Sequence, residues 1–338
     1  MSQQYAKDQP KGFTNKIERV AIVGAGGSVG QYLAESLVKT GQHTVTAISR
    51  IGSTSPIPAG VNVVNVDYDD EASLVAALKG QQFLAISVSV SAPQDTQEKL
   101  VKAAAKAGVK WIMPNCYGTD LTNKKLTGEN FTRADAGVLA IEKVGYSSWV
   151  AMVCGFWYEF STACPPEWYG FDIANRKATF YDDGKTRINT STWIQCGNAL
   201  AGLLSLKELP DDENDTAPSI SQWRDKPLYV SSFKLNQREM LDSLQRVTGT
   251  TDADWSIDYE GSRERWERGK ALLASGERRG HAMAMYARTF FPNGDGDFEA
   301  KNGTANKVLG LPEEDLDEAS RRAVAMVEGG YNYFTKRV

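Results

Sequence analysis

The sequence has few of the residues that build metal centres and histidine-based catalytic triads. Only two histidines, His43 and His281, occur among its 338 residues, and neither has a suitable partner nearby in the sequence. The cysteines also lie far apart, without the Cys-x-x-Cys spacing that is typical of zinc or redox sites. They are Cys116, Cys154, Cys164 and Cys196. We therefore expect no metal centre and no triad, and both histidines are expected to pack in or line the interior.

Long hydrophobic runs and clusters of basic residues are missing as well. No stretch reaches the about 18 consecutive apolar residues of a membrane-spanning helix, and residues 1–16 are polar, without the apolar core of a signal peptide. The net charge of -4, with no local Lys/Arg cluster, argues against nucleic acid and anionic membranes as partners. We expect a cytoplasmic monomer or homodimer whose partner is a small molecule.

A strand, a glycine-rich turn and a helix follow one another near the start of the chain. Val20–Val23 is apolar, glycines stand at positions 24, 27 and 30, and residues 31–39 carry apolar side chains at helical spacing. A second, alternating strand over residues 43–48 completes a βαβ unit. In such a unit the backbone N–H groups and the positive end of the helix dipole hold a cofactor pyrophosphate. A glycine-rich turn without a ligand is the alternative interpretation.

The end of the second strand indicates which cofactor is bound. An acidic residue at this place would accept hydrogen bonds from the ribose 2′-hydroxyl of NAD, but the sequence here is Ser49-Arg50, followed by further hydroxyl residues. A guanidinium and hydroxyls suit the 2′-phosphate of NADP(H). We therefore predict NADP(H) as the cofactor, with a solvated surface arginine as the alternative.

Strands and helices continue to alternate after the first βαβ unit. The pattern predicts strands at 62–66, 83–88 and 109–113, and helices at 71–78 and 94–107. Short apolar strands that alternate with amphipathic helices form a parallel sheet covered on both faces. The expected fold class is therefore α/β: a Rossmann-type doubly wound parallel sheet with a smaller, mostly helical C-terminal substrate lobe.

Beyond residue 160 the sequence contains aromatic-rich loops. The segment Tyr181-Asp-Asp-Gly-Lys185, between alternating residues, predicts a hairpin over residues 178–190. On a hairpin these Tyr and Lys side chains would not share a face, so we do not expect them to form the Tyr-x-x-x-Lys pair of short-chain dehydrogenases. Further elements are expected as a helix at 193–206, an exposed acidic loop at 210–219, a strand at 228–233, a helix at 237–248 and a largely helical region at 252–338.

These patterns divide the chain into a nucleotide-binding domain and a discontinuous substrate lobe. Residues 1–16 are expected to be disordered or to form an arm. The NADP-binding Rossmann domain is expected over residues 17–160, with returning segments at about 188–248. The substrate lobe is expected to comprise residues 161–187 and 249–338.

Several segments together resemble the NmrA-like, isoflavone-reductase-like family, and its fungal secondary-metabolism members in particular. They are the glycine loop 24–30, Arg50, and the segments 111–120, 155–159 (Gly-Phe-Trp-Tyr-Glu) and 290–297 (Phe-Phe-Pro-Asn-Gly-Asp-Gly-Asp). The resemblance covers nearly the whole chain from Ile17. It implies an atypical short-chain dehydrogenase that binds NADP(H) and holds its substrate between the nucleotide domain and the C-terminal lobe.

The resemblance also implies a catalytic lysine, which this chain lacks. In reductases of the family the lysine begins the helix after the fifth-strand loop, and the matching residue here is Ala134. The adjacent Arg133 could orient an oxyanion but stays protonated near neutral pH. Proton handling then falls to Tyr117, Asp120 and Tyr158 on strand-end loops, for which packing or loop capping is the alternative.

The remaining predicted site residues follow from the rule that ligands of a doubly wound sheet bind beyond the carboxyl ends of its strands. The cofactor is expected to contact Gly24, Gly27, Ser28, Val29, Gly30, Ser49, Arg50, Asp67, Ser87, Val88, Asn115, Cys116, Gly155 and Phe156. Substrate contacts are expected from Trp157, Trp168, Tyr169 and Met285. The aromatic residues suit a flat, apolar ligand, but they could equally belong to the core.

We therefore predict an NADP(H)-dependent oxidoreductase that transfers hydride to a C=N, C=C or C=O group of a bulky aromatic or alkaloid-like secondary metabolite. An iminium carbon would suit the missing lysine, because it accepts hydride without a proton donor. Two alternatives stay open at this point. One is a redox-neutral, NADP(H)-assisted cyclase or isomerase, and the other is a non-catalytic redox-sensing regulator.

Overall fold

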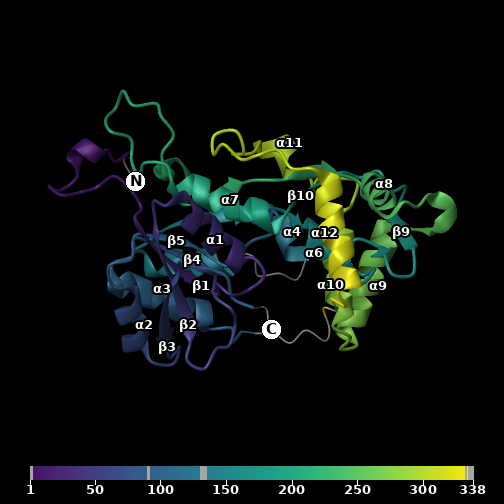
Figure 1. Ribbon diagram of the computed structural model, residues 1–338, viewed down its shortest axis with the longest axis horizontal. Helices are drawn as coiled ribbons and strands as arrows, with labels where there is room; N and C mark the ends of the chain where they lie inside the picture. Colours follow the sequence, from purple (N-terminus) through teal and green to yellow (C-terminus); the bar gives the residue numbers. More distant parts are fainter. Residues whose placement is uncertain (1–2, 90–91, 130–134, 332, 334–338) are drawn as a thin grey trace.

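A seven-stranded parallel sheet forms the centre of the first lobe (Figure 1). The computed structural model describes residues 3–89, 92–129, 135–331 and 333. The strand order is β11-β6-β5-β4-β1-β2-β3, and every pairing in it is parallel. The strands are β1 (Arg19–Val23), β2 (Thr44–Arg50), β3 (Asn62–Val66), β4 (Phe83–Ile86), β5 (Trp111–Met113), β6 (Ser148–Val153) and β11 (Lys226–Tyr229).

Helices cover both faces of this sheet because its central strands are apolar on both sides. In β1, Val20 and Ile22 belong to one buried cluster, and Ala21 and Val23 belong to the other. Successive side chains of a strand point to opposite faces, so a continuous apolar strand needs cover on each side. The first face packs against α1 (Gly30–Thr40) and α7 (Trp193–Leu204), and the second against α2 (Glu71–Leu78), α3 (Thr96–Ala107) and α5 (Ala136–Val144). This arrangement confirms the expected Rossmann-type fold.

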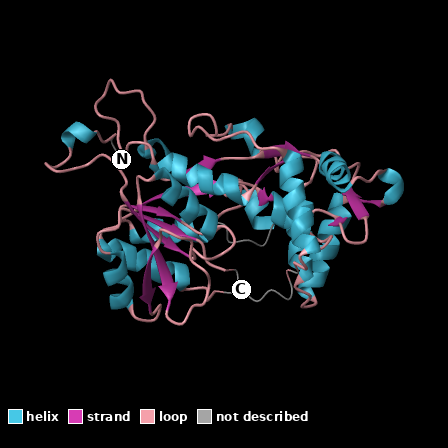
Figure 2. Ribbon diagram, viewed as in Figure 1, coloured by secondary structure: helices cyan, strands magenta, loops and turns pink. Residues whose placement is uncertain are grey.

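The second lobe consists of two small sheets and the C-terminal helices (Figure 2). Aromatic side chains around Tyr169, Tyr181 and Tyr286 form its buried core. The sheets are β12-β10-β7 and β13-β9-β8, built from β7 (Phe156–Trp157), β8 (Phe171–Asp172), β9 (Lys177–Tyr181), β10 (Ile188–Ser191), β12 (Phe233–Leu235) and β13 (Ser256–Glu260). The remaining α-helices are α4 (Lys124–Glu129), α6 (Tyr158–Ala163), α8 (Gln237–Thr248), α9 (Ser262–Ala274), α10 (Arg279–Thr289), α11 (Phe298–Asn302) and α12 (Leu316–Glu328). Short 3-10 helices are η1 (Ala6–Asp8), η2 (Ile220–Trp223) and η3 (Asp252–Asp254).

Our expectation of a hairpin over residues 178–190 is wrong, because its two strands do not pair with each other, although the turn between them forms. The backbone N–H of Gly184 donates to the carbonyl of Tyr181 at 2.9 Å, so the chain does reverse at the Asp-Gly sequence. However, β9 pairs with β8 and β13, whereas β10 pairs with β7 and β12. A turn sequence specifies a local change of direction. The partners of a strand depend on segments distant in the sequence that can cover its two edges.

The single strand expected at 228–233 is divided into two strands of different sheets. β11 belongs to the first sheet and β12 to the second lobe. Between them, the N–H of Val230 donates to the carbonyl of Val153, and the N–H of Ser232 donates to that of Thr190, each at 3.0 Å. The chain therefore crosses from one lobe to the other at this point, while its apolar character continues without a break.

α8 lies in the second lobe, so our expectation that helix 237–248 returns to the nucleotide domain is wrong. Its ends are those that the sequence indicates: Asn236 and Glu239 form a capping box, and Gly249 ends the helix with φ +64°. Its apolar face, with Met240 and Leu244, packs in the second-lobe core. Local signals set the length of this helix, but the lobe that it joins depends on which core its apolar face completes. β13 likewise interrupts the region expected to be helical.

The described part of the N-terminal arm lies against the loop after α7. The N–H of Ala6 donates to the carbonyl of Pro210 at 2.8 Å, and the N–H of Lys7 donates to that of Asp211 at 3.1 Å. The Lys7 ammonium also pairs with the carboxylate of Glu213. The acidic loop expected at 210–219 thus serves as the docking surface of the arm.

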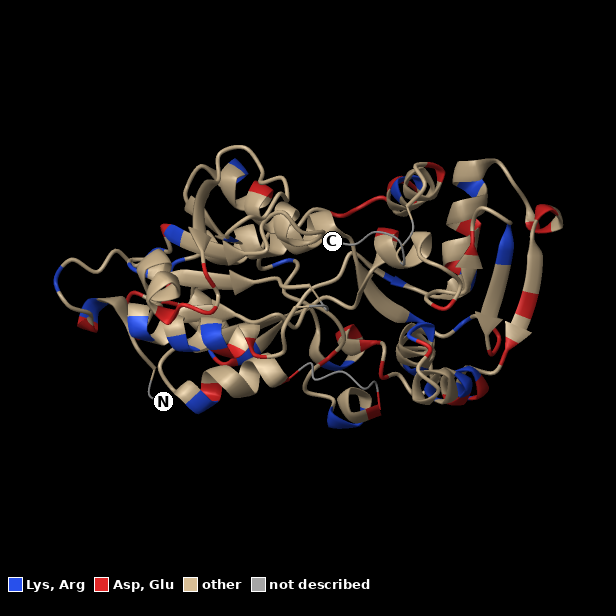
Figure 3. Ribbon diagram, turned by 90° about the horizontal axis from the view of Figure 1, so that it is seen from below, with Lys and Arg blue, Asp and Glu red and all other residues tan. Residues whose placement is uncertain are grey.

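The outer surface carries charges of both signs. Figure 3 shows Lys and Arg interspersed with Asp and Glu on the helices of both lobes. Within the part of the chain that the structure describes, every helix is too short or too polar to cross a membrane.

Candidate functional site

The glycine loop 24–30 forms a tight backbone cradle between β1 and α1. The N–H of Gly27 donates to the carbonyl of Gly24 at 2.9 Å. Gly24 has φ +78°, and a β-carbon there would lie 1.8 Å from the carbonyl oxygen of Ser87. A β-carbon at Gly30 would lie 1.9 Å from the carbonyl oxygen of Gly24. Side chains are excluded at both positions, so a ligand can approach the backbone of this loop closely.

The N-terminus of α1 is suited to an anionic ligand. α2, α7, α8 and α12 each begin with a side chain that accepts a hydrogen bond from the backbone of the first turn. In the described structure α1, which follows Val29, has neither such a cap nor an acidic residue in its first turn. Its first turn, which no side chain caps, and its dipole therefore favour a negatively charged group such as a pyrophosphate.

Arg50 and Asp67 lie at the carboxyl ends of the neighbouring strands β2 and β3, where the sequence predicts the adenosine end of the cofactor. Both side chains are exposed. Burial raises the pKa of the adjacent Tyr68 hydroxyl to about 12, and the positive charge of Arg50 opposes this rise. Ser49 is half-buried beside them. The predicted 2′-phosphate site is thus an open surface with a guanidinium at its edge.

Hydrogen bonds fix the predicted residues after β4 and β5 against neighbouring strand ends. The N–H of Ser87 donates to the carbonyl of Val23 at 3.0 Å, and the Asn115 amide donates to the carbonyl of Val88 at 3.1 Å. These contacts hold the ends of β1, β4 and β5 next to the glycine loop. Cys116 is buried, and burial raises the pKa of its thiol, so the sulfur is neutral near neutral pH.

The predicted proton-handling residues of the fifth-strand loop differ in their surroundings. Among the described residues, the buried Tyr117 hydroxyl has no hydrogen-bond partner, and burial raises the pKa of this hydroxyl well above its ordinary value. Asp120 is occupied: one carboxylate oxygen accepts from the Thr122 N–H at 2.9 Å, from its hydroxyl at 2.7 Å and from the Tyr229 hydroxyl at 3.1 Å. Asp120 therefore organises a turn, which was the alternative interpretation. Arg133 and Ala134 lie outside the described residues.

Tyr158 does not face the strand ends as expected. It is fully buried in the second lobe, and its hydroxyl shares a 2.7 Å hydrogen bond with the Ser320 hydroxyl of α12. Ser320 in turn bonds to Ser243 of α8 at 2.7 Å. This packing accounts for Tyr158 without a catalytic role, because the hydroxyl is enclosed between two helices.

Most of the predicted aromatic wall belongs to the second-lobe core. Trp168 and Tyr169 are buried there, and the Tyr169 hydroxyl shares a hydrogen bond with that of Thr190 at 2.9 Å. Phe156 stacks on Tyr286 with 3.7 Å between ring centroids. Met285 packs at the margin of the same core.

At Gly155, φ is +67° and a β-carbon would lie 2.1 Å from the carbonyl oxygen of Asn189, so this glycine lets the chain turn into β7. The half-buried Trp157 packs instead against the first-lobe cluster.

A cavity of about 680 Å³ opens beside the glycine loop, between the two lobes. It lies between the start of α1, the starts of α6 and α7, and the end of α12. Its lining residues are Ser28, Gln31, Tyr32, Glu159, Trp193, Arg322, Ala325, Met326, Gly329, Gly330 and Tyr331. Its volume is in the range of small-molecule binding sites. Of the residues predicted from the sequence, Ser28 alone is in this lining.

Glu159 is the buried acid of this cavity. It is 2% exposed, in the first turn of α6, and one carboxylate oxygen accepts a hydrogen bond from the backbone N–H of Trp193 at 2.9 Å. Burial raises the pKa of Glu159 to about 7, with a further rise from the charge of Glu314, while backbone hydrogen bonds and the charge of Arg322 oppose this rise. A carboxyl group with this pKa can exchange a proton near neutral pH.

Glu159 is a site residue that the sequence patterns did not predict, although it ends the segment 155–159. The usable signal was a carboxylate at the end of the aromatic segment 155–159, just after a strand of the parallel sheet. No comparable signal exists for Trp193 and Arg322, which come from distant helices and meet only in the folded chain.

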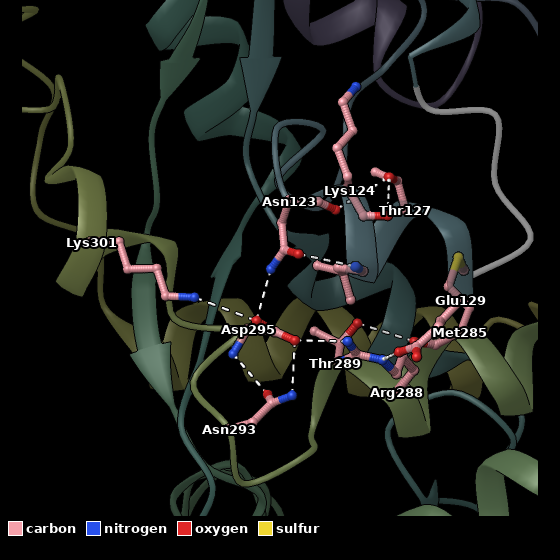
Figure 4. A network of polar contacts seen from close by, with 11 residues as sticks. Asn123, Lys124, Thr127, Glu129, Met285, Arg288, Thr289, Asn293, Asp295 and Lys301 are labelled. Atoms are coloured by element: carbon pink, nitrogen blue, oxygen red, sulfur yellow. Dashed lines mark hydrogen bonds and ion pairs between the residues drawn. The ribbon is translucent and has the colours of Figure 1, made fainter.

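A network around Asp295 explains the segment 290–297 (Figure 4). Arg288 is fully buried and donates to Asp295 at 2.7 Å and to Glu129 of α4. Asn123 donates to the other carboxylate oxygen of Asp295 at 2.8 Å. Burial alone would raise the pKa of Asp295, but the hydrogen bonds from Arg288 and Asn123 lower it. The motif thus fastens α4, and with it the loop after β5, to the second lobe.

The fold and the glycine loop define a Rossmann-type, doubly wound α/β protein with an added lobe. More particularly, the first part of the chain is similar to the NmrA-like family, and its fold is similar to that of isoflavone reductase. The sequence model of that family matches residues 16–132.

Similar proteins cover most of the chain. The oxidoreductase aprR of Aspergillus flavus is 28% identical over 306 residues, which are 89% of this chain and 96% of that protein. The crystal structure of isoflavone reductase superposes with a TM-score of 0.66 at 17% identity, over 90% of this chain and 99% of the other. The binary complex of leucoanthocyanidin reductase with NADPH from Vitis vinifera gives a TM-score of 0.65 at 17% identity, over 91% and 99%. These two structures are evidence for the shared fold.

Proposed function

We propose that this protein binds NADP(H) and is an oxidoreductase that acts on a bulky aromatic small molecule. The observation that carries the proposal is the backbone cradle at Gly24 and Gly30, which opens on the uncapped N-terminus of α1 with Arg50 at the neighbouring strand end. The relative aprR is named an oxidoreductase, and the similarly folded leucoanthocyanidin reductase is a complex with NADPH. Both facts support the proposal.

Each part of the site has a task in this function. The N–H groups of the glycine loop and of α1 would hold the pyrophosphate, Arg50 would bind the 2′-phosphate, and Ser87 and Asn115 would lie along the nicotinamide half. When bound, NADP(H) supplies or accepts a hydride. The cavity beside Ser28 would hold the other reactant out of bulk water, which a purely structural nucleotide site would not need.

Arg50→Ala is expected to weaken NADPH binding about tenfold or more while hardly changing NADH binding. The reason is that a charge-assisted hydrogen bond to the 2′-phosphate contributes about 1.5–3 kcal/mol and NADH has no such phosphate. Isothermal titration calorimetry with both nucleotides measures the effect. Lys79→Ala, which removes an exposed positive charge after α2, is the matched control and should change neither affinity. Equal losses for both nucleotides in Arg50→Ala would contradict the assignment.

The ratio of NADPH consumed to product formed distinguishes the oxidoreductase from the redox-neutral alternative. With a reactive aromatic substrate, an oxidoreductase consumes one NADPH for each product molecule, whereas a cyclase or isomerase forms product without net loss of NADPH. Absorbance of the reduced nicotinamide and chromatography of the product, followed in the same reaction, decide between the two. Binding of NADPH without turnover of any aromatic substrate would favour the redox-sensing regulator.

A further inference from the structure

Polar atoms of three residues in the cavity lining have no hydrogen-bond partner among the described residues. They are Oε2 of Glu159, Nε1 of Trp193, and Nε and Nη2 of Arg322. Glu159 is 2% exposed and Trp193 is 7% exposed, so bulk water does not satisfy these groups. Because buried polar atoms are nearly always paired, unpaired atoms of three residues around one cavity indicate that a polar ligand completes them.

The unpaired atoms are mostly hydrogen-bond donors. The indole N–H of Trp193 and the guanidinium of Arg322 can only donate, and Oε2 of Glu159 donates when the carboxyl is protonated. Among the described residues, the ion pair of Arg322 is with Glu314, at 3.8 Å. The two carboxylate oxygens of Glu314 share the hydroxyl hydrogen of Thr192, and one of them also accepts a hydrogen bond from the Ser232 hydroxyl. The ligand group that suits such donors is an oxygen acceptor.

The apolar part of the lining is flat. Tyr32 of α1 and Trp193 of α7 stack with 5.9 Å between ring centroids and 21° between ring planes. Ala325 and Met326 of α12 lie on the lining beside Arg322. A planar aromatic ligand could lie against such a surface with its oxygen directed to the donors.

We propose that this cavity is the substrate site, that it binds a flat aromatic compound through a carbonyl oxygen, and that Glu159 donates the proton that this oxygen takes up. The proposal rests on the proposed oxidoreductase function and names its substrate class and proton donor. Glu159 would thereby serve in place of the lysine that this chain lacks at residue 134.

The proton and electron balance of the step is simple. NADP(H), held by the glycine loop, would supply the hydride to the carbonyl carbon, so that a C–H bond would form and the electron pair of the C=O π bond would move to oxygen. The O–H bond of Glu159 breaks, and its proton goes to that oxygen, which gives an alcohol and oxidised nicotinamide. The Glu159 carboxylate then takes a proton from water. Trp193 and Arg322 would stabilise the negative charge that develops on oxygen.

The charges around Glu159 fit a group that changes protonation near neutral pH. Arg322 faces it from α12 and Glu314 from the segment before α12, and their charges act in opposite directions. From α1, the Tyr32 hydroxyl is a neutral neighbour: its pKa is raised by burial, and further by Glu159 and Glu35. Burial is thus the largest influence on the pKa of Glu159. A ligand that excludes more water from the cavity would raise this pKa further.

Ligand class is tested with acetylnaphthalene, a flat aromatic ketone, and ethylnaphthalene, a hydrocarbon of nearly the same shape. Fluorescence titration of the full chain is expected to show about tenfold tighter binding of the ketone, because two or more hydrogen bonds depend on its oxygen. Equal affinity for the two compounds, or no binding of either, would overturn the assignment of the ligand class.

The role of Glu159 is tested with Glu159→Gln, which keeps the oxygen that accepts from the Trp193 N–H but cannot titrate. In the wild type, affinity for acetylnaphthalene should fall about tenfold as the pH rises through about 7, because the carboxyl loses its donor proton. The affinity of Glu159→Gln should be independent of pH over this range. Glu35→Gln, a nearby substitution outside the lining, should keep the wild-type profile. A pH-independent wild type, or a Glu159→Gln variant that retains the profile, would overturn the proton-donor role.

Unfolding measurements test the same protonation without a ligand. Because the folded-state pKa of Glu159 lies above its ordinary value of 4.5, its contribution to stability is full below about pH 4.5 and is lost as the pH rises through about 7. Urea unfolding should therefore show Glu159→Gln gaining stability relative to the wild type across this window. If the difference in free energy of unfolding between the two proteins did not change with pH, the raised pKa of Glu159 would be contradicted.

NADPH titrations on the same samples separate the two proposals. Absence of NADPH binding would contradict the proposed function. Intact NADPH binding, with a Glu159→Gln variant that behaves like the wild type, would contradict this inference alone.

Discussion

Gly30→Ala is expected to lower the free energy of unfolding by about 3 kcal/mol or more and to abolish measurable NADPH binding. The added methyl group would lie 1.9 Å from the carbonyl oxygen of Gly24 and 3.2 Å from the Cα of Ala25. Both neighbours are backbone atoms, so no side chain can rotate away, and overpacking of this kind costs about 1–3 kcal/mol or more. The start of α1 must move away from β1, and the anion cradle is lost with it.

Urea unfolding followed by circular dichroism, with NADPH titration of the folded variant, measures both effects. Gly41→Ala at the other end of α1 is the control, since it has φ +66° but no atom within 4 Å of an added β-carbon. Its effect should be about 1 kcal/mol, from backbone strain alone, with NADPH affinity unchanged. If Gly30→Ala were no more destabilising than Gly41→Ala, the close contact in the glycine loop would be refuted.

Asp295→Ala is expected to destabilise the protein by about 3 kcal/mol, because it removes one of the two carboxylates that pair with a buried guanidinium. Arg288 is fully buried, and Asp295 is its partner at 2.7 Å from the loop before α11. Asn123 loses its acceptor in the same substitution, so α4 keeps only the Glu129–Arg288 contact of this network and should be held less firmly against the second lobe. Proteolysis near residues 123–129 should therefore become faster together with the loss of stability.

Asp258→Ala provides the comparison for this effect. Asp258 is an exposed carboxylate of the same lobe, on β13, and its loss should change the free energy of unfolding by less than about 0.5 kcal/mol. Chemical unfolding of the two variants, with limited proteolysis and mass spectrometry, measures the difference. Equal stabilities of Asp295→Ala and Asp258→Ala would show that the Arg288 network does not hold the lobes together.

The first lobe could be predicted from the sequence because its signals are local. The strand at 62–66 and the helix at 71–78 have the expected ends in the structure. The glycine loop forms the predicted turn between β1 and α1, since only glycine permits the approaches seen at Gly24 and Gly30. Each of these features depends on residues within one or two turns of the chain.

The candidate site could be predicted only in part. Tyr158 and Glu159 are neighbours in the sequence, yet the first lies in the second-lobe core and the second lines the cavity. Their different directions arise in the first turn of α6, where successive side chains point about 100° apart. Which direction leads to a core and which to a cavity depends on α7 and α12, and no local pattern around residues 155–159 contains that information.

By itself, the sequence determined the alternation of strands and helices, the doubly wound sheet and the glycine cradle with Arg50 at the next strand end. Apolar periodicity and the conformational freedom of glycine act over short stretches of chain, so these features can be read without the fold. Only the tertiary structure decided the partners of β9 and β10, the lobe of α8, and the meeting of Glu159, Trp193 and Arg322 around one cavity. These depend on which distant surfaces bury one another, and that is a property of the whole folded chain.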